Sequence, residues 1–410
     1  MSASATALPM SPAQSRQRWL MLGLVWAMYA CFGIATGSTA PLVEPIVKDL
    51  GLSYSEMGVI MGAWQLAYIG TAYPMGVLID RLGVRTSLGV GILVIAASLV
   101  LRAMAGNFLT LFLAVALFGV GGPIISIGAP KVVAQWFQGN QRGLAAGIYA
   151  TGPVGGAALA LATAGSVIMP MTGSWRGVPL VFAGIALAVA AAWWLLARDA
   201  PASNTSGATS GTQAEAVKGP PLLSIHNVQL LLVMAAMTFT VNHGLSNWSP
   251  TLLRESGMSL AQAGAWTAFA TALGATGLLF IPSLARHGRR VLTLSLLLAL
   301  TAISGVGLAL GDGPVLLGSL TLSAMARSPL MPVLTLVLME TPGIGAARMG
   351  TAGGLFFAVA EVGGFGGPFL LGYLRDTTGS LTTGALTLAG VSLALLLVVL
   401  FIKEGRQETG

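Results

Sequence analysis

Charged side chains inside long apolar stretches are the residues of this sequence best placed to do chemistry. Arg327 lies about thirteen residues into the apolar stretch 314–339, and Glu361 lies at a similar depth in the stretch 349–371. A guanidinium near the middle of a bilayer costs at least ~2.5–3.5 kcal/mol, so Arg327 should face protein or water and have a partner. We expect Glu361 to be that partner. Either the pair is a structural ion pair, or Arg327 binds an anionic group while Glu361 carries a coupling proton.

Polar and aromatic side chains in other apolar stretches form a second set of candidates. His243 and Asn247 lie four residues apart and so share one face of a predicted helix, with Asn242 at the edge of that face. They could hydrogen-bond a solute or a neighbouring helix, although a single histidine in a membrane helix is more often a packing residue. Tyr29 and Tyr149 are further candidates for the wall of a cavity.

The sequence lacks the motifs expected for metal binding, for ATP hydrolysis and for enzymatic catalysis. The three histidines lie far apart, Cys31 is the single cysteine, and no glycine-rich phosphate loop with its lysine occurs. These absences argue against a metal site and against ATP as an energy source. No nucleophile and base occur together in an apolar stretch. We therefore expect no cofactor and no enzymatic activity.

The composition indicates a membrane protein. Of the 410 residues, 55% are hydrophobic and 8% are charged, and the mean hydropathy is +0.83. A soluble domain carries about 25% charged residues, so this chain could not cover a water-facing surface and we expect a lipid bilayer around it. The 55 glycines fit the close helix packing of membrane proteins. The net charge of +7 resides in short loops, and we expect no nucleic-acid partner.

The apolar stretches predict an all-α fold of twelve transmembrane helices, because each has about the 20 residues that span a bilayer. They form two sets of six: 19–41, 56–79, 86–105, 108–131, 143–169 and 175–197, then 224–249, 260–283, 290–310, 314–339, 349–371 and 381–402. The predicted domains are a disordered tail at 1–18, six-helix bundles at 19–198 and 223–403, a flexible linker at 199–222, and a tail at 404–410.

The loop charges predict the orientation. Thirteen of the twenty Lys and Arg residues fall on the side of the two termini and five fall on the opposite side. This bias places both termini in the cytoplasm of a cell whose inner membrane the chain crosses many times.

The two sets of helices resemble each other in sequence. One group of residues recurs 206 positions later: Gly51, Ser53 and Gly58 as Gly257, Ser259 and Gly264. Two further groups recur at shifts of 205 and 207. Three groups at nearly one shift predict two pseudo-symmetric bundles, and parallel repeats of this kind place a solute at their interface.

The loop after the second apolar stretch carries the most specific motif, with Gly76, Asp80, Arg81, Gly83 and Arg85 in the segment GVLIDRLGVR. Together with the twelve helices, it resembles the loop motif of the major facilitator superfamily. The resemblance implies that the aspartate caps a neighbouring helix and pairs with an arginine in the outward-facing state, which would make these five residues a conformational gate. The alternative is a glycine turn with orienting charges. The second-half copy lacks the aspartate.

Two other segments bear on the substrate. Gly152-Pro153 resembles the antiporter motif of drug exporters but lacks one residue of it, and kinking or close packing explains it as well as gating does. Asn242-His-Gly244 and Trp248-Ser-Pro250 resemble the cyanate and 2-nitroimidazole permeases, which implies a bias toward small anions.

The sequence thus predicts a secondary transporter, either a symporter or an antiporter. We expect it to act as a monomer by alternating access, coupled to a proton or another ion. The expected solute is a small anion such as a carboxylate or an inorganic anion. The first alternative is proton-driven efflux of drug-like compounds, and the second is a non-transporting receptor.

Overall fold

The computed structural model describes residues 12–138, 140–200, 220–286 and 288–403, and the regular structure within these ranges is helical. Six long helices build the N-terminal half: α1 (Pro12–Gly37), α3 (Tyr54–Leu82), α4 (Val84–Met104), α5 (Phe108–Trp136), α6 (Asn140–Thr163) and α8 (Gly177–Leu196). Two short helices lie between them at one face, α2 (Val43–Leu50) and α7 (Met169–Thr172). Seven helices build the C-terminal half: α9 (His226–Glu255), α10 (Leu260–Leu284), α11 (Arg290–Leu310), α12 (Gly313–Arg327), α13 (Leu330–Glu340), α14 (Gly345–Thr378) and α15 (Leu381–Val399).

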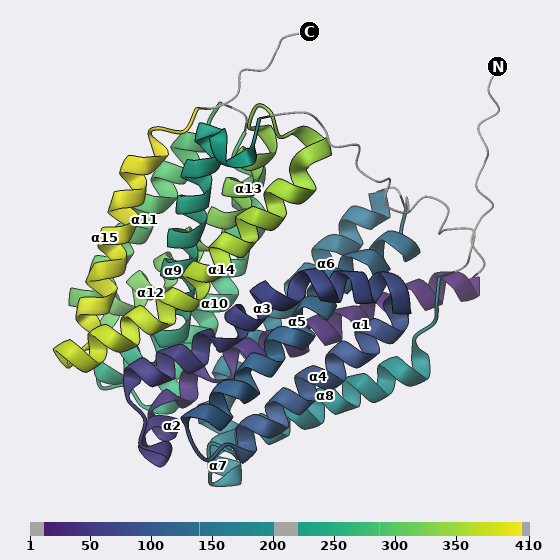
Figure 1. Cartoon of the computed structure of the whole chain (residues 1–410). Helices are drawn as coiled ribbons and strands as arrows, with labels where there is room; N and C mark the ends of the chain where they lie inside the picture. Colours follow the sequence, from purple (N-terminus) through teal and green to yellow (C-terminus); the bar gives the residue numbers. More distant parts are fainter. Residues whose placement is uncertain (1–11, 139, 201–219, 287, 404–410) are drawn as a thin grey trace.

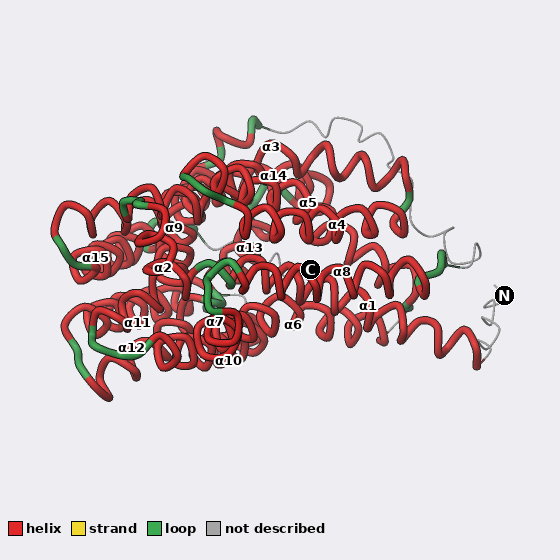
Figure 2. The backbone as a smooth tube through the Cα atoms, turned by 90° about the horizontal axis from the view of Figure 1, so that it is seen from below, coloured by secondary structure: helices red, strands yellow, loops and turns green. Residues whose placement is uncertain are grey.

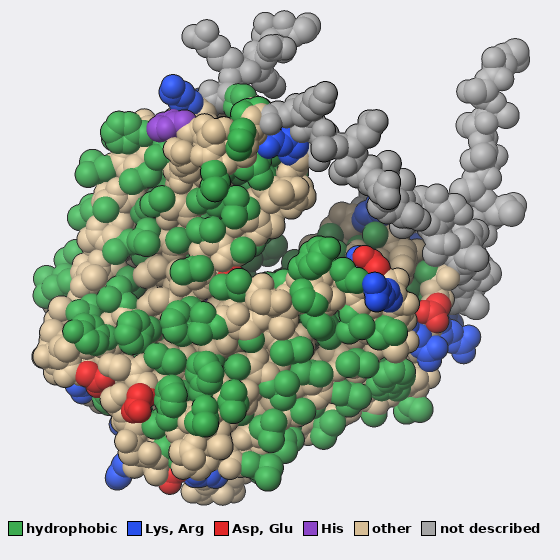
Figure 3. All heavy atoms as spheres, in the orientation of Figure 1, with side chains coloured by type: hydrophobic (Ala, Val, Ile, Leu, Met, Phe, Trp, Pro, Cys, Tyr) green, Lys and Arg blue, Asp and Glu red, His purple; other side chains and the backbone are tan. Residues whose placement is uncertain are grey.

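The predicted membrane-spanning helices are present. Eleven helical segments of the described chain have the length and hydropathy needed to cross a bilayer. Helix α3 is the twelfth: it is 29 residues long but less apolar, because it contains Gln65 and three tyrosines. Figure 3 shows the expected surface, in which hydrophobic side chains dominate the broad middle and charged side chains lie mainly toward the two ends.

The two halves diverge toward one face and meet at the other. Helices α1 and α9 begin, and α8 and α15 end, at the open face, where a hollow separates the halves (Figures 1 and 3). Figure 2 shows the C-terminal helices α9, α11, α12 and α15 gathered on one side and the N-terminal helices α1, α4, α5 and α8 toward the other. We call the face where α2 and α7 lie the closed face. In the views of Figures 1 and 3, the hollow between the halves opens at the opposite, open face.

Two boundaries differ from the sequence prediction. Helix α1 begins at Pro12, so 12–18 is helical where a disordered tail was expected; a proline suits the first helical turn, and Gln17 donates to the carbonyl of Leu196 at 3.1 Å. The stretch predicted as one helix over 314–339 is divided at Ser328–Pro329 into α12 and α13. The other predicted tail residues and most of the linker lie outside the described ranges.

The sequence repeat corresponds to a repeated turn at the closed face. Gly51 has φ +64° and Ser53 then caps α3 by accepting from the amide of Glu56. Gly257 has φ +93° and Ser259 caps α10 in the same way. Only glycine adopts this left-handed conformation without strain, which is why these glycines are repeated. The two halves are pseudo-symmetric at the level of individual turns.

Glycines let the two halves approach closely. A side chain on Gly58 or Gly62 of α3 would collide with the α14 backbone at Pro368 or Phe365. On the other side of the cavity, a side chain on Gly264 of α10 would collide with the carbonyl of Leu161 in α6. The closed face is therefore sealed along α3–α14 and α6–α10 by backbone contact.

Candidate functional site

Arg327 lies at the helix break and points into the protein. It is the last residue of α12, and only 8% of it is exposed. Its Nη1 donates to the carbonyl oxygen of Asn242 at 2.7 Å, to Oδ1 of the same residue at 3.0 Å, and to Oγ of Ser246 at 2.6 Å. The end of a helix also favours a cation, because the last carbonyls point toward it. The charge is thus solvated by neutral acceptors on α9.

The expected ion pair with Glu361 is not present in this conformation. Among the described residues, Arg327 forms no ion pair within 4 Å. Glu361 is 8% exposed, and its Oε2 has no hydrogen-bond partner within the described chain. Arg327 has partners, as expected, but the prediction that Glu361 is one of them is wrong, because Nη1 donates to Asn242 and Ser246 instead. In this conformation, therefore, no ion pair between Arg327 and Glu361 connects the tenth and eleventh predicted spans.

Glu361 belongs to a different polar group, which we call the Gly364 junction: Gln65 of α3, His243 of α9, and Glu361 and Gly364 of α14. A methyl group on Gly364 would lie 3.0 Å from Oε2 of Glu361, 3.2 Å from Cγ of Gln65 and 3.4 Å from Cδ2 of His243. Nε2 of Gln65 lies 3.3 Å from both Nδ1 of His243 and the carbonyl oxygen of Gly364. The junction joins the two halves through a fully buried glutamine.

A cavity of about 210 Å³ lies between the halves beside Arg327. One wall is polar and comes from four residues of α9, namely Asn242, His243, Ser246 and Asn247. The opposite wall is mostly apolar, with Phe32 of α1, Trp64 of α3 and Leu161 of α6 among its members. The structure thus brings the three predicted α9 residues together at one cavity, with Arg327 directly behind two of its polar lining residues.

The two predicted tyrosines lie together on the N-terminal side. The rings of Tyr29 in α1 and Tyr149 in α6 stack with centroids 5.9 Å apart, and Tyr29 also contacts Phe32, a cavity residue, at 5.5 Å. Neither tyrosine lines the 210 Å³ cavity itself. A direct role in solute binding therefore stays a prediction.

The predicted gate residues lie at the open face. Asp80, near the end of α3, forms an ion pair with Lys131 of α5 at 2.5 Å, so in this conformation its partner is a lysine of the same half. Gly83 has φ +79°, which allows the sharp turn between α3 and α4. Arg81 is exposed, and a side chain on Gly76 would meet no atom within 4 Å outside its own helix backbone. Pairing of Asp80 with an arginine in the opposite conformation remains a prediction.

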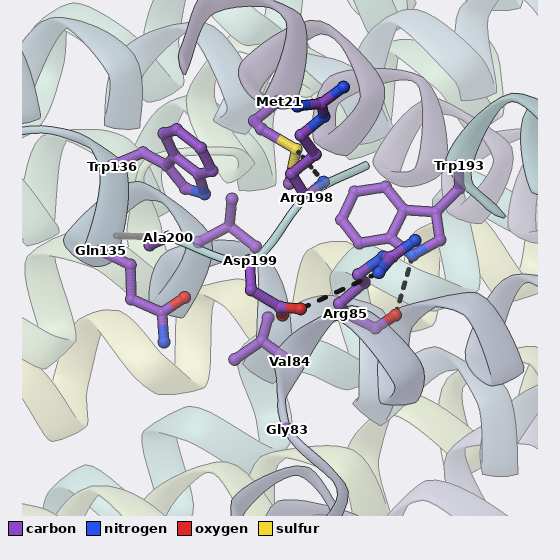
Figure 4. Close-up of a pocket in the computed structure, with 11 residues that line it drawn as sticks. Met21, Gly83, Val84, Arg85, Gln135, Trp136, Trp193, Arg198, Asp199 and Ala200 are labelled. Atoms are coloured by element: carbon purple, nitrogen blue, oxygen red, sulfur yellow. Dashed lines mark hydrogen bonds and ion pairs between the residues drawn. The ribbon is translucent and has the colours of Figure 1, made fainter. Parts of the chain in front are cut away.

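Arg85 lines a second cavity, of about 160 Å³, within the N-terminal half (Figure 4). Its Nη1 lies 3.9 Å from a carboxylate oxygen of Asp199, just beyond the end of α8. Its carbonyl oxygen accepts from Nε1 of Trp193 at 2.8 Å. The second motif arginine therefore connects the turn before α4 to the segment that leads out of the N-terminal bundle.

Gly152 and Pro153 mediate packing of α6 on α1. A side chain on Gly152 would lie 2.9 Å from the carbonyl oxygen of Trp26, and a side chain on Gly33 would collide with the backbone of Pro153. These contacts lie within one half and fit the close-packing interpretation of the segment. A gating role has no support from these contacts.

Sequence reasoning missed Ser246 and assigned no specific role to Gln65. Ser246 lies four residues after Asn242, so the same helical spacing that grouped His243 with Asn247 would have found it. The signal for Gln65 was a lone amide in an apolar stretch; its partners come from distant helices and no local pattern reveals them. Within the described ranges, no group of three or more His, Cys, Asp or Glu side chains could hold a metal ion.

The comparisons with known proteins agree with the fold. Residues 25–368 match the Major Facilitator Superfamily. The chain is 26% identical to the hexuronate transporter of Bacillus subtilis (strain 168), covering 89% of this chain and 90% of that protein. It is 26% identical to the cyanate transport protein CynX of Escherichia coli (strain K12), covering 84% and 86%. It is also 23% identical to the quinolone resistance protein NorA of Staphylococcus aureus (strain MRSA252), covering 92% and 94%.

Solved structures show the same fold. A bacterial homolog of the human lysosomal transporter Spinster, in an inward-facing and occupied conformation, superposes with a TM-score of 0.75 at 16% identity over 96% of both chains. The twelve helices, the repeated halves and the match over most of the chain lead to one conclusion. This chain belongs to the major facilitator superfamily and is a multi-pass membrane protein. The predicted resemblance to this family is confirmed, and the predicted similarity to a cyanate permease is borne out by CynX.

Proposed function

We propose that this chain is a secondary carrier that moves a small anion across the membrane by alternating access. The observation that carries the proposal is the state of Arg327, a buried cation that neutral acceptors hold beside the central cavity. Because no described carboxylate pairs with it, the cavity keeps a positive charge behind its polar wall. Such a site attracts an anion and repels a cation.

The names of two relatives support an anionic solute. A hexuronate carries a carboxylate, and cyanate is a small inorganic anion. Guanidinium groups and amide side chains are suitable donors for either. In this proposal the amides of Asn242 and Asn247 and the hydroxyl of Ser246 orient the anion, and Arg327 supplies the charge.

We propose that Glu361 carries the coupling proton. It is a buried carboxylate in α14 whose Oε2 has no partner among the described residues, and its charged form is costly there unless it gains one. A carboxylate of this kind exchanges a proton when the cavity changes the face to which it opens. In this proposal one residue, Glu361, carries the coupling proton, and a different residue, Arg327, supplies the positive charge that binds the anion.

We further propose that the open face is cytoplasmic, that the membrane is the inner membrane of the cell, and that a single chain is the working unit. The excess of Lys and Arg on the side of the termini supports this orientation. One chain contains both halves and the whole cavity between them. The conformation described here would then be the inward-open one.

Uptake into proteoliposomes tests the function. Purified protein should accumulate an isotopically labelled hexuronate or cyanate when an inward proton gradient is imposed, and Arg327→Ala should lower the uptake to background. Arg327→Lys keeps the charge but loses the fixed geometry of the guanidinium, so we expect roughly a tenfold loss. The control is Arg102→Lys in α4: Arg102 is also buried and bonded to neutral acceptors, Ala35 O at 2.7 Å and Thr39 Oγ1 at 3.3 Å, but it does not line the cavity itself and donates to none of the polar residues of its α9 wall.

The coupling proposal has its own assay. Glu361→Gln should abolish accumulation driven by the proton gradient and retain counterflow exchange of the same anion. Full transport by Arg327→Ala, or gradient-driven accumulation by Glu361→Gln, would each refute the role assigned to that residue. Equal loss in Arg102→Lys and Arg327→Lys would reduce Arg327 to a structural residue.

The similarity to NorA leaves one alternative, proton-driven efflux of drug-like compounds. The charge of the solute discriminates between the two functions, because a positively charged cavity repels cations. The same proteoliposomes should show no gradient-driven movement of a cationic dye. Transport of the dye, with no transport of either anion, would favour the exporter.

A further inference from the structure

Two buried oxygens at the Gly364 junction have no hydrogen-bond donor. They are Oε2 of Glu361 on α14 and Oε1 of Gln65 on α3, and neither has a partner among the described residues. Gln65 is fully buried, and Glu361 is 8% exposed. A buried acceptor without a donor is costly. As long as Glu361 is ionised, neither oxygen can satisfy the other, because both only accept.

The orientation of the Gln65 amide is fixed by its neighbour. Nε2 lies 3.3 Å from the carbonyl oxygen of Gly364, and a carbonyl can only accept, so the nitrogen must be on that side. Oε1 therefore points away from Gly364 O. Both Glu361 and Gln65 border the point where a side chain of Gly364 would lie, at 3.0 Å and 3.2 Å. These distances are to Oε2 of Glu361 and to Cγ of Gln65, so the carboxylate oxygen and the Gln65 side chain share one small buried region.

We propose that Gln65 is the positioning residue for the coupling proton: when Glu361 is protonated, its O–H donates to Oε1 of Gln65. The inference rests on the proposed role of Glu361 as the proton carrier. One proton is taken from water onto the carboxylate, and the hydrogen bond then satisfies both oxygens. Because the two residues belong to different halves, the bond requires the α3–α14 packing seen here. Protonation therefore stabilises this conformation, and loss of the proton releases it.

Three other ionisable groups lie around this site, on α3, α9 and α12, of which α3 and α9 pack against α14. Tyr68 of α3 is within electrostatic range of Glu361. His243 of α9 contacts Gln65, and Arg327 of α12 is within electrostatic range of His243. Glu340 at the end of α13 pairs with Arg290, and α15 contains no ionisable residue.

The competing proton acceptor is His243, and it acts in the opposite direction. With a proton on Nδ1, His243 would face the Nε2 of Gln65 donor to donor across 3.3 Å. Protonation of His243 therefore weakens the contact between the halves, whereas protonation of Glu361 strengthens it. If acid pH favours the conformation described here, Glu361 takes up the proton; if acid pH disfavours it, His243 does.

A distance measurement without any solute tests the proposal. The single cysteine, Cys31, is replaced by alanine in the full chain, and spin labels are placed at Leu82→Cys and Met339→Cys, which are exposed residues at the open ends of α3 and α13. Distances between the labels are measured by pulsed electron paramagnetic resonance in lipid nanodiscs from pH 5 to 9. We expect acid pH to enrich the long distance of the open conformation.

The variants then locate the proton. Glu361→Gln carries an amide that donates permanently to Gln65, so its distances should match the acid wild type at every pH. Gln65→Met removes the acceptor and should move the midpoint about half to one pH unit lower, the loss of one hydrogen bond to the protonated form. Gln65→Asn keeps the amide but withdraws it by one methylene, and should move the midpoint in the same direction. The matched control Gln135→Met alters a glutamine of the second cavity and should change nothing.

Several outcomes would overturn the proposal: a wild type without pH response, an unchanged midpoint in both Gln65 variants, or enrichment of the open conformation at alkaline pH. Loss of the response in His243→Gln with Glu361 intact would assign the proton to His243 instead. The test is independent of the solute. If neither anion is transported but the distances respond as expected, only the proposed solute class is wrong.

Discussion

Gly364 leaves the space into which three buried polar side chains pack. Three polar side chains from three helices come within 3.4 Å of the position that its side chain would occupy. Two of them, Gln65 and Glu361, are buried with an unsatisfied oxygen among the described residues. A methyl group at this point would move polar groups that have little room to move.

We therefore expect Gly364→Ala to lower the stability by about 1–3 kcal/mol and to impair gradient-driven uptake more than counterflow exchange. The thermal unfolding midpoint in detergent and the two uptake assays measure these effects. Gly366→Ala is the matched control on the same helix, because no atom lies within 4 Å of its added methyl group. Equal effects of both substitutions would contradict the junction as the cause.

At the residue scale, the sequence predicted which charges matter but not their partners. The cost of a guanidinium in hydrocarbon was enough to predict that Arg327 faces inward. Its partners, Asn242 and Ser246, lie more than eighty positions away on another helix. Equal depth made Glu361 the expected partner, but depth along the membrane normal does not fix which way a side chain points around its helix.

The break between α12 and α13 is the element that positions Arg327. Pro329 has no N–H with which to continue the hydrogen bonding of α12, and α13 restarts with the amide of Val333 donating to Pro329 O at 3.0 Å. Arg327 therefore lies at a helix end rather than on a continuous surface. An interrupted helix in the membrane is tolerated where it is buried in protein or lines a cavity, as here.

Pro329→Ala should allow the helix to run through the break and turn the guanidinium away from α9. Loss of one charge-assisted contact of about 1.5 kcal/mol predicts roughly tenfold weaker uptake of the hexuronate with little change in unfolding temperature. Hydrogen exchange of the residue 329 amide would report the new helical bond. Pro332→Ala is the control, because Pro332 lies in the first turn of α13, where an amide has no helical partner. Equal loss in both would refute the break as the cause.

Element prediction succeeded wherever composition alone decides the structure. The spans and the repeated turns follow from apolar length and from glycine and serine spacing. The break within 314–339 was missed although Pro329 marks it, because prolines also occur inside continuous membrane helices such as α5, which contains Pro123 and Pro130. The sequence does not say which proline interrupts a helix; packing decides it.

At the scale of the whole molecule, two carboxylates connect the halves at the closed face. Asp376 at the end of α14 accepts from the amides of Tyr54 and Ser55 at 3.0 and 2.7 Å, and so caps α3 of the other half. Glu44 of α2 pairs with Arg254 of α9 at 3.0 Å. A carboxylate at a helix N-terminus is favourable because the free amides point toward it. These contacts must break when the closed face opens.

Asp376→Ala should therefore shift the population away from the open conformation described here. Charge-assisted hydrogen bonds of about 1.5–3 kcal/mol predict a shift of roughly tenfold or more, read from the spin-label distance between positions 82 and 339 at fixed pH. Asp312→Ala is the control: Asp312 lies in the turn before α12 and makes no capping hydrogen bond. An unchanged distance distribution in Asp376→Ala would show that the cap contributes nothing to the equilibrium.

The backbone seam between the halves has a mechanical consequence. Where α3 meets α14, and α6 meets α10, glycines such as Gly58, Gly62 and Gly264 present bare peptide to the opposing carbonyls. If bulky side chains interdigitated at these two interfaces, each would have to withdraw before the helices could separate. Surfaces without interlocking side chains can separate in one movement, so resistance to opening resides in the polar contacts between the halves, at the Gly364 junction and at the closed face.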